Sequence, residues 1–97
     1  PMKAMLITFN ITPGKQTDFE AAMSFHVKNV RTRDPNYSFY SLTRDRDIDT
    51  RYILMQQIES WETQEAHQTY DYVLDAMPAM NACIAGSPTI DWLEVIV

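Results

Sequence analysis

Tyr37-Ser-Phe-Tyr-Ser-Leu-Thr-Arg44 and Arg51-Tyr-Ile-Leu-Met-Gln-Gln-Ile58 are the two segments that decide the fold. Both are rich in the aromatic and branched residues that favour β-strands. The segment between them, Asp45-Arg-Asp-Ile-Asp-Thr50, is short, polar and acidic, as a hairpin loop should be. The two strands are therefore predicted to pair antiparallel in the middle of the chain.

The residues before this hairpin predict a strand followed by a helix. Residues 3–11 form an apolar run without a helix breaker, and Thr12-Pro-Gly-Lys15 is typical of a turn. From 16 to 34 the apolar residues follow the spacing of an amphipathic helix, and Pro35 ends it. The stripe consists of Phe19, Ala22, Met23, Val27 and Val30.

The residues after the hairpin repeat this plan in reverse. A second helix is predicted to begin near Trp61, with Ser60 as its N-cap and Thr63 as the second choice. Pro78 is expected to kink or break it, leaving a short helical piece over 79–84. After a turn at 86–88, residues 89–97 predict a closing strand. The apolar side of the helix comprises Ala66, Tyr70, Val73, Leu74 and Met77.

The order β-α-β-β-α-β predicts one α+β domain over residues 1–97, a ferredoxin-like antiparallel sheet with the helices on one face. Apolar residues occupy both faces of the predicted strands, but two or three helices can cover only one face. We expect a second copy of the sheet to cover the other, which makes the protein a homodimer.

Composition narrows the class of protein. The 97 residues include 13 acidic and 8 basic side chains, a formal charge of −5. A negative net charge argues against nucleic acid and anionic membranes as partners. No run of eighteen apolar residues and no secretory leader is visible, so we expect a cytoplasmic protein. The single cysteine, Cys83, can form neither an internal disulfide nor a metal site alone.

The sequence lacks the residue patterns of most kinds of catalytic site. There is no glycine-rich phosphate loop and no cluster of cysteine and histidine at metal-ligand spacing. We therefore expect no cofactor and no metal. Any chemistry must come from a few polar groups inside an apolar cavity.

Several local patterns, in this order, resemble the antibiotic biosynthesis monooxygenase family. They are Ile11-Thr-Pro-Gly-Lys15, Asp34-Pro-Asn-Tyr37, Leu42-Thr-Arg-Asp45 with Arg51-Tyr-Ile-Leu54, and Glu59-Ser60 with Ala66-His67. The resemblance implies a dimeric α+β barrel. It also implies cofactor-independent oxidation of an electron-rich aromatic, such as a quinol, anthrone or polyketide, by dioxygen.

The chain departs from the family pattern at the corner after the third strand. Members usually carry Glu-x-Trp-x-Ser, with a histidine about nine residues after the tryptophan. An ungapped comparison places Gln56 at the glutamate, Ile58 at the tryptophan and His67 at the histidine. A comparison with three inserted residues matches Trp61 instead and places Tyr70 at the histidine. We favour the ungapped comparison because it preserves the distance to the closing strand.

Three residues are candidates for the chemistry. The imidazole of His67 could accept a phenolic proton, oriented by Asp71 four residues later on the same helix face. Tyr70 lies one turn from His67 and is the alternative base. Asn10, near the end of the first strand, could donate to a substrate oxygen, as an asparagine on this strand does in some relatives. We expect Asn10, His67 and Tyr70 to line one pocket between the sheet and the second helix, with Trp61 nearby.

Aromatic side chains are candidates for substrate binding. Trp61, Tyr37 and Tyr40 could stack on a flat substrate or donate a hydrogen bond to a quinone oxygen. His26 is interpreted as a residue beside the apolar stripe of the first helix rather than as part of a site.

Three other functions stay open at this point. One is binding or degradation of haem by the same fold, with His67 as the proximal ligand. Another is a dimer that binds a small molecule without turnover. The third is proton transfer by the secondary amine of Pro1, as in tautomerases.

Overall fold

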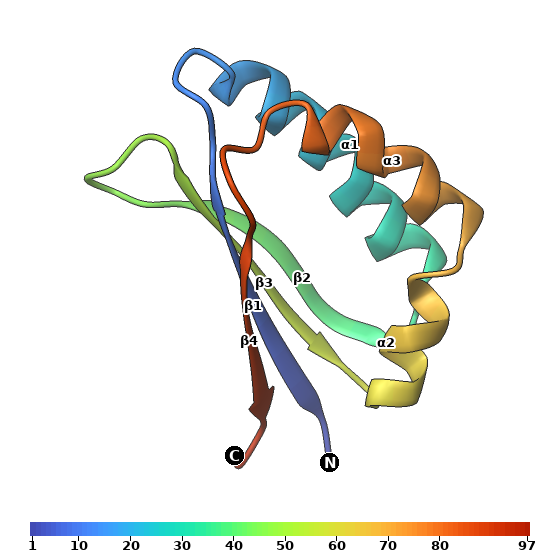
Figure 1. Ribbon diagram of the computed structural model, residues 1–97. Helices are drawn as coiled ribbons and strands as arrows, with labels where there is room; N and C mark the ends of the chain where they lie inside the picture. The colour runs from blue at the N-terminus through green and yellow to red at the C-terminus, as the bar shows by residue number, and fades with distance from the viewer.

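A computed structural model describes all residues, 1–97, and contains four strands and three helices. The helices lie on one side of a twisted sheet, and both termini lie at the same end of the molecule (Figure 1). In chain order the elements are β1 (Lys3–Asn10), α1 (Gln16–Arg33), β2 (Tyr37–Arg44), β3 (Arg51–Ile58), α2 (Trp61–His67), α3 (Asp71–Asn81) and β4 (Thr89–Glu94).

The sheet has the strand order β2-β3-β1-β4, and every neighbouring pair is antiparallel. The predicted hairpin of β2 and β3 is confirmed, with Leu42 opposite Leu54. β1 lies between β3 and β4, so the first and last strands of the chain are adjacent. This is the ferredoxin-like α+β arrangement expected from the order of the elements.

The core fills the space between the sheet and the helices. Alternate residues of β1 and β3 face α1, and the predicted stripe of α1 packs against them because both surfaces are apolar. The central side chains are almost fully buried: Phe9, Phe19, Met23, Val30, Tyr52, Leu54 and Ile58. The rings of Phe9, Phe19 and Tyr52 contact one another in tilted and edge-to-face arrangements.

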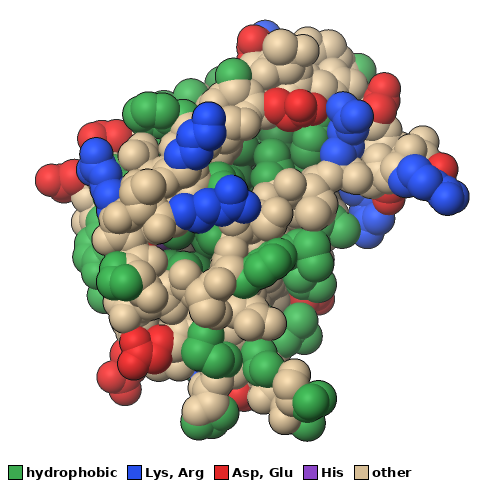
Figure 2. Space-filling model, turned by 180° about the vertical axis from the view of Figure 1, so that it is seen from behind, with side chains coloured by type: hydrophobic (Ala, Val, Ile, Leu, Met, Phe, Trp, Pro, Cys, Tyr) green, Lys and Arg blue, Asp and Glu red, His purple; other side chains and the backbone are tan.

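The other face of the sheet has no helix over it. Side chains alternate along a strand, so this open face carries the residues of β1 and β3 that do not contact the helices. It includes the exposed side chains of Phe39, Met55 and Leu93. Seen from behind, hydrophobic side chains reach the surface over both halves of the molecule, whereas most Lys and Arg side chains lie in the upper half (Figure 2).

The second helical region differs from the expectation. It is divided at Gln68–Tyr70, before Pro78, and Pro78 lies inside α3. Thr69 accounts for the division, because its hydroxyl and its backbone N–H both donate to the carbonyl of Ala66. Tyr70 then takes an extended conformation and precedes the first turn of α3. Pro78 is tolerated in α3 although it cannot donate a backbone hydrogen bond.

The predicted N-cap is confirmed, since the Ser60 hydroxyl accepts the N–H of Thr63 at 3.1 Å. Two strand ends differ by a few residues. β4 ends at Glu94, while Ile11 leaves β1 to pair with Ile84. None of the helices combines the length and the hydrophobicity that crossing a membrane requires.

Candidate functional site

A cavity of about 150 Å³ lies between the sheet and α3. Four of its polar side chains come from four different elements: His26 on α1, Tyr40 on β2, Gln56 on β3 and His67 on α2. Gln68 and Asn81 also line it. The rest of its wall is largely apolar, and includes Ile7, Phe9, Leu54, Val73, Met77, Met80, Ile84 and Pro88. A small apolar space with a few converging polar groups is the usual form of a binding site for a small molecule.

His67 and Asp34 form a buried pair at one end of this cavity. The Nδ1 atom of His67 lies 2.9 Å from Oδ2 of Asp34, and each side chain is only 2% exposed. The carboxylate accepts a hydrogen bond from Nδ1–H, so the neutral imidazole keeps its lone pair on Nε2. Nε2 makes no hydrogen bond within the protein, so it is the atom of His67 available to a ligand in the cavity.

The surroundings keep His67 neutral at physiological pH. Burial lowers its pKa, and the hydrogen bond and negative charge of Asp34 oppose that shift in part. An uncharged imidazole held by a carboxylate can accept a proton from a ligand, because Asp34 stabilises the imidazolium that results.

A second histidine faces the same cavity. His26 is 4% exposed, and its Nε2 lies 3.2 Å from the hydroxyl of Tyr40. Burial, and then the proximity of His67, lower the pKa of His26 to about 4. Burial also raises the pKa of Tyr40. Both groups are therefore neutral near pH 7, and they can donate or accept hydrogen bonds without adding charge to the cavity.

Gln56 completes the polar part of the wall. It is buried in β3, opposite Tyr40 on one side and Met5 on the other. Its side-chain amide makes no hydrogen bond within the protein and lines the cavity. It can thus donate to a carbonyl oxygen or accept from a hydroxyl group of a bound molecule.

Three tyrosine rings that do not line the cavity lie close to the imidazole of His67. The ring of Tyr37 lies 4.6 Å from the imidazole, and those of Tyr70 and Tyr72 lie 5.8 and 6.0 Å away. The hydroxyl groups of Tyr37 and Tyr72 are buried without a hydrogen-bond partner. Burial raises the pKa of both phenols. Tyr70 contacts His67 but does not line the cavity.

Asn10 does not converge with His67, contrary to the expectation of a shared pocket. It lies at the end of β1 opposite Arg51, is exposed, and does not line the cavity. Alternation places its side chain with those of Leu6 and Thr8, on the open face of the sheet. Only its backbone contacts the helical side, where its carbonyl accepts the N–H of Ala85 at 2.7 Å.

Trp61 lies outside the cavity, in a neighbouring groove of about 750 Å³ between α2 and β4. Its ring meets that of Trp92 edge to face, with centroids 5.5 Å apart. Met5, Ile7 and Ile90 supply most of the remaining apolar wall. The predicted substrate-binding aromatics are thus divided: Tyr40 lines the cavity, Tyr37 contacts the ring of His67, and Trp61 lines the groove.

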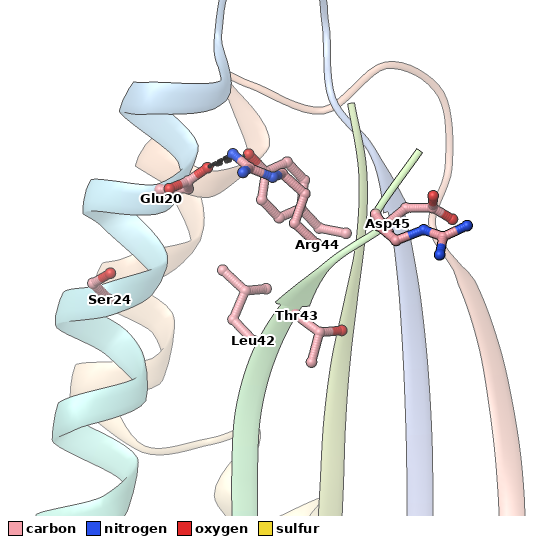
Figure 3. Close-up of a pocket in the computed structure, with 8 residues that line it drawn as sticks. Glu20, Ser24, Leu42, Thr43, Arg44 and Asp45 are labelled. Atoms are coloured by element: carbon pink, nitrogen blue, oxygen red, sulfur yellow. Dashed lines mark hydrogen bonds and ion pairs between the residues drawn. The ribbon is translucent and has the colours of Figure 1, made fainter. Parts of the chain in front are cut away.

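A third hollow, of about 540 Å³, lies on the surface where β2 ends and is lined mostly by charged and polar side chains. Figure 3 shows Glu20 of α1 reaching Arg44 of β2, while Asp45 lies on the far side of the strand. The Arg44 and Glu20 side chains are 3.2 Å apart, and the hydroxyl of Tyr52 donates to the same carboxylate. These contacts join α1 to β2 and β3, which indicates a structural role.

No three histidine, cysteine, aspartate or glutamate side chains come together in a way that could hold a metal ion. Pro1 is exposed at the chain terminus and does not line the cavity.

Comparison with known proteins agrees with this fold. The family model of antibiotic biosynthesis monooxygenases matches residues 2–79. The chain belongs to the antibiotic biosynthesis monooxygenase family. No curated protein matches it.

Solved structures share the fold over almost the whole chain. A Caulobacter crescentus protein assigned to the antibiotic biosynthesis monooxygenases is 26% identical and superposes with a TM-score of 0.94, covering 99% of this chain and 91% of that one. A Nitrosomonas europaea protein with the same assignment is 15% identical, with a TM-score of 0.92 over 98% and 90% of the two chains. A Bordetella bronchiseptica protein is 18% identical, with a TM-score of 0.84 over 99% and 98%. Because the last two proteins are less than 25% identical to this chain, their similarity shows the fold alone.

For two roles in the site, the structure of this family member differs from the interpretation of its sequence. Asp71, expected to orient His67, lies in the first turn of α3, and Asp34 takes that place. His26 was interpreted as a residue beside the stripe. Its spacing from Phe19 and Met23, seven and three residues, places it on the buried side of α1, and this was the signal that could have identified it.

Proposed function

We propose that this member of the monooxygenase family oxidises an electron-rich aromatic, of the quinol type, with dioxygen and without a cofactor. The observation that carries the proposal is the buried Asp34–His67 pair, whose free Nε2 belongs to a side chain lining a small apolar cavity. Family membership supplies the reaction class, and the pair supplies the base that such a reaction needs.

The first step is removal of a phenolic proton. A substrate hydroxyl bound next to Nε2 of His67 transfers its proton to the imidazole. The adjacent Asp34 carboxylate stabilises the imidazolium. The apolar walls exclude water, so the substrate anion is poorly solvated and becomes a stronger reductant.

The electrons for the reaction all come from the substrate. The anion gives one electron to dioxygen, and the resulting pair of radicals combines at a ring carbon to form a hydroperoxide. Loss of water from that carbon leaves a quinone with one new oxygen atom. One atom of dioxygen enters the product and the other enters water, so a monocyclic quinol yields a hydroxyquinone and no external reductant is consumed.

Hydrogen-bond donors would hold the developing carbonyl oxygen. Gln56 and Tyr40 are suited to this role because their polar atoms lie in adjacent strands and line the cavity. His26 accepts or donates at the Tyr40 hydroxyl and so fixes its direction. The role first assigned to Asn10 passes to Gln56, since Asn10 lies on the other face of the sheet.

Haem does not fit this site. His67 could offer Nε2 to an iron, but it opens into about 150 Å³, a space far smaller than a porphyrin. The walls of that space include apolar residues of β1, β3 and α3.

We also propose that the protein is a homodimer assembled through the open face of the sheet. Phe39, Met55 and Leu93 on that face are each more than a third exposed although they are large and apolar. A second sheet packed face to face would remove them from water, which is the usual reason for such an interface.

The oxidation is tested with an oxygen electrode, on protein freed of metals and with a panel of monocyclic quinols, naphthoquinols and anthrones. We expect oxygen uptake above the rate without protein, with quinone absorbance rising in parallel. His67→Ala should reduce oxygen uptake to the rate without protein. If no compound in the panel gives uptake, although ligands bind, the protein is a binding dimer and the proposed activity is wrong.

A further inference from the structure

The cavity and the neighbouring groove adjoin each other. Ile7 and Gln68 line both of them. On the sheet, Tyr40, Gln56, Met5 and Trp92 form one row across the four strands. Two strand spacings, about 10 Å, separate Gln56 in the cavity from Trp92 in the groove.

The two spaces differ in size and in chemistry. The inner cavity of about 150 Å³ matches the size at which a buried apolar space in another protein, roughly 150 Å³, accommodates a benzene ring. It therefore has room for one six-membered ring and not for three fused ones. The groove is larger, open to solvent, and has no polar group positioned by a buried partner.

The groove also selects against negative charge. Glu65 and Glu94 line it and no Lys or Arg side chain does, while Glu94 is paired with Lys3. A carboxylate or phosphate in the groove would meet these charges without compensation. An apolar chain would instead cover Trp92, which is 56% exposed, and Ile90, which is also exposed.

We propose that the substrate is a single-ring quinol or phenol with an uncharged apolar side chain, whose ring lies in the cavity and whose side chain lies along the groove against Trp61 and Trp92. This inference rests on the proposed function for the identity of the ring. It adds the division of the ligand between the two spaces and excludes fused tricyclic substrates.

Binding of redox-stable phenols under nitrogen tests the inference without turnover. Calorimetry with phenol, 4-ethylphenol, 4-butylphenol and 4-hexylphenol should show affinity rising about three- to fourfold per methylene group, the gain expected for burying one. The same hexyl chain ending in a carboxylate should bind more weakly than 4-hexylphenol. Fluorescence should change as well, since Trp61 and Trp92 are the only tryptophans.

Two variants separate the groove from other apolar surfaces. Trp92→Ala should flatten the dependence on chain length while leaving the affinity for phenol itself unchanged. Phe25→Ala removes an exposed aromatic ring from α1, in a different hollow, and should have no effect. Trp61→Ala provides a second measurement at the same groove.

The inference is wrong if affinity does not depend on chain length, or if a tricyclic phenol binds more tightly than 4-hexylphenol. It is also wrong if Trp92→Ala changes the sedimentation coefficient instead of ligand affinity, because a second copy of the chain would then occupy the groove. Failure of the proposed activity gives a different result, namely length-dependent binding of phenols with no oxygen uptake from the corresponding quinols.

Discussion

The Oδ2 atom of Asp34 lies 2.9 Å from Nδ1 of His67, and this contact joins the C-terminal end of α1 to the last residue of α2. Pro35 keeps Asp34 in an extended conformation at the end of the helix. The other carboxylate oxygen, Oδ1, accepts the N–H of Asn36 at 3.2 Å. The turn that ends α1 therefore orients the carboxylate toward the histidine.

Replacing Asp34 by asparagine should lower kcat by roughly 10²- to 10⁴-fold, because His67 would lose most of what a positioned general base contributes. An amide at this place neither stabilises an imidazolium nor fixes the proton on Nδ1. Steady-state oxygen uptake measures the effect, with thermal unfolding to verify that the variant is folded. Asp71→Asn is the matched control and should retain activity; a loss there instead would return the orienting role to Asp71.

Stability should fall as the pH is lowered from 6.5 to about 4, in part because of His26. Its pKa is about 4 in the folded protein, against an ordinary value of 6.5. Between these values the unfolded chain binds a proton that the folded chain does not, so acid favours unfolding, by up to about 3 kcal/mol for this group.

The contribution of His26 is isolated by comparing the protein with His26→Gln in urea titrations at several pH values. Between pH 6.5 and 4 the variant should lose less of its free energy of unfolding than the parent. Equal losses in the two proteins would show that folding does not lower the pKa of His26.

Much of the fold could be predicted from the sequence because local patterns determine it. The strand segments at 37–44 and 51–58 alternate around a polar loop, and the stripe of α1 keeps helical spacing over five residues. The division of the second helix was missed, since it depends on two hydrogen bonds from Thr69 to Ala66. Propensity and the position of Pro78 do not reveal such a local competition for a carbonyl group.

The site was harder to predict than the fold. His67 was identified through the family resemblance, but its partner Asp34 is 33 residues away and only the folded chain brings the two together. Asn10 was predicted to line the pocket because an amide can bind a substrate oxygen. Side chains alternate along β1, however, and Asn10 lies on the other face of the sheet. Which side chains share a cavity depends on strand register, and the sequence did not provide that register.

The N-cap of α2 should make a measurable contribution to stability. Ser60→Ala removes the hydrogen bond to the N–H of Thr63 and should cost about 1 kcal/mol. Urea unfolding gives the difference. Thr32→Ala, at an exposed hydroxyl that donates only to carbonyls of its own helix, should change the free energy of unfolding by much less. Equal effects would contradict the capping role.

A charge on the open face of the sheet should separate the proposed dimer. Met55→Lys places an ammonium group at the centre of that face, where a facing sheet could not solvate it. Sedimentation at micromolar concentration should give a dimer for the parent and a monomer of about 11 kDa for the variant. A parent that sediments as a monomer would rule out the interface. Phe25→Lys, on the helical side, should remain a dimer.

The incorporation of ¹⁸O from labelled dioxygen tests the central claim, that His67 supplies the base for a monooxygenation without a cofactor. Metal-free protein is mixed with an alkylated monocyclic quinol under ¹⁸O₂, and the product is analysed by mass spectrometry before its carbonyl oxygens exchange with water. We expect a hydroxyquinone with one ¹⁸O atom per molecule, formed at least about a hundredfold more slowly by His67→Ala. Release of hydrogen peroxide with an unlabelled quinone, or an equal rate in the variant, would contradict the account.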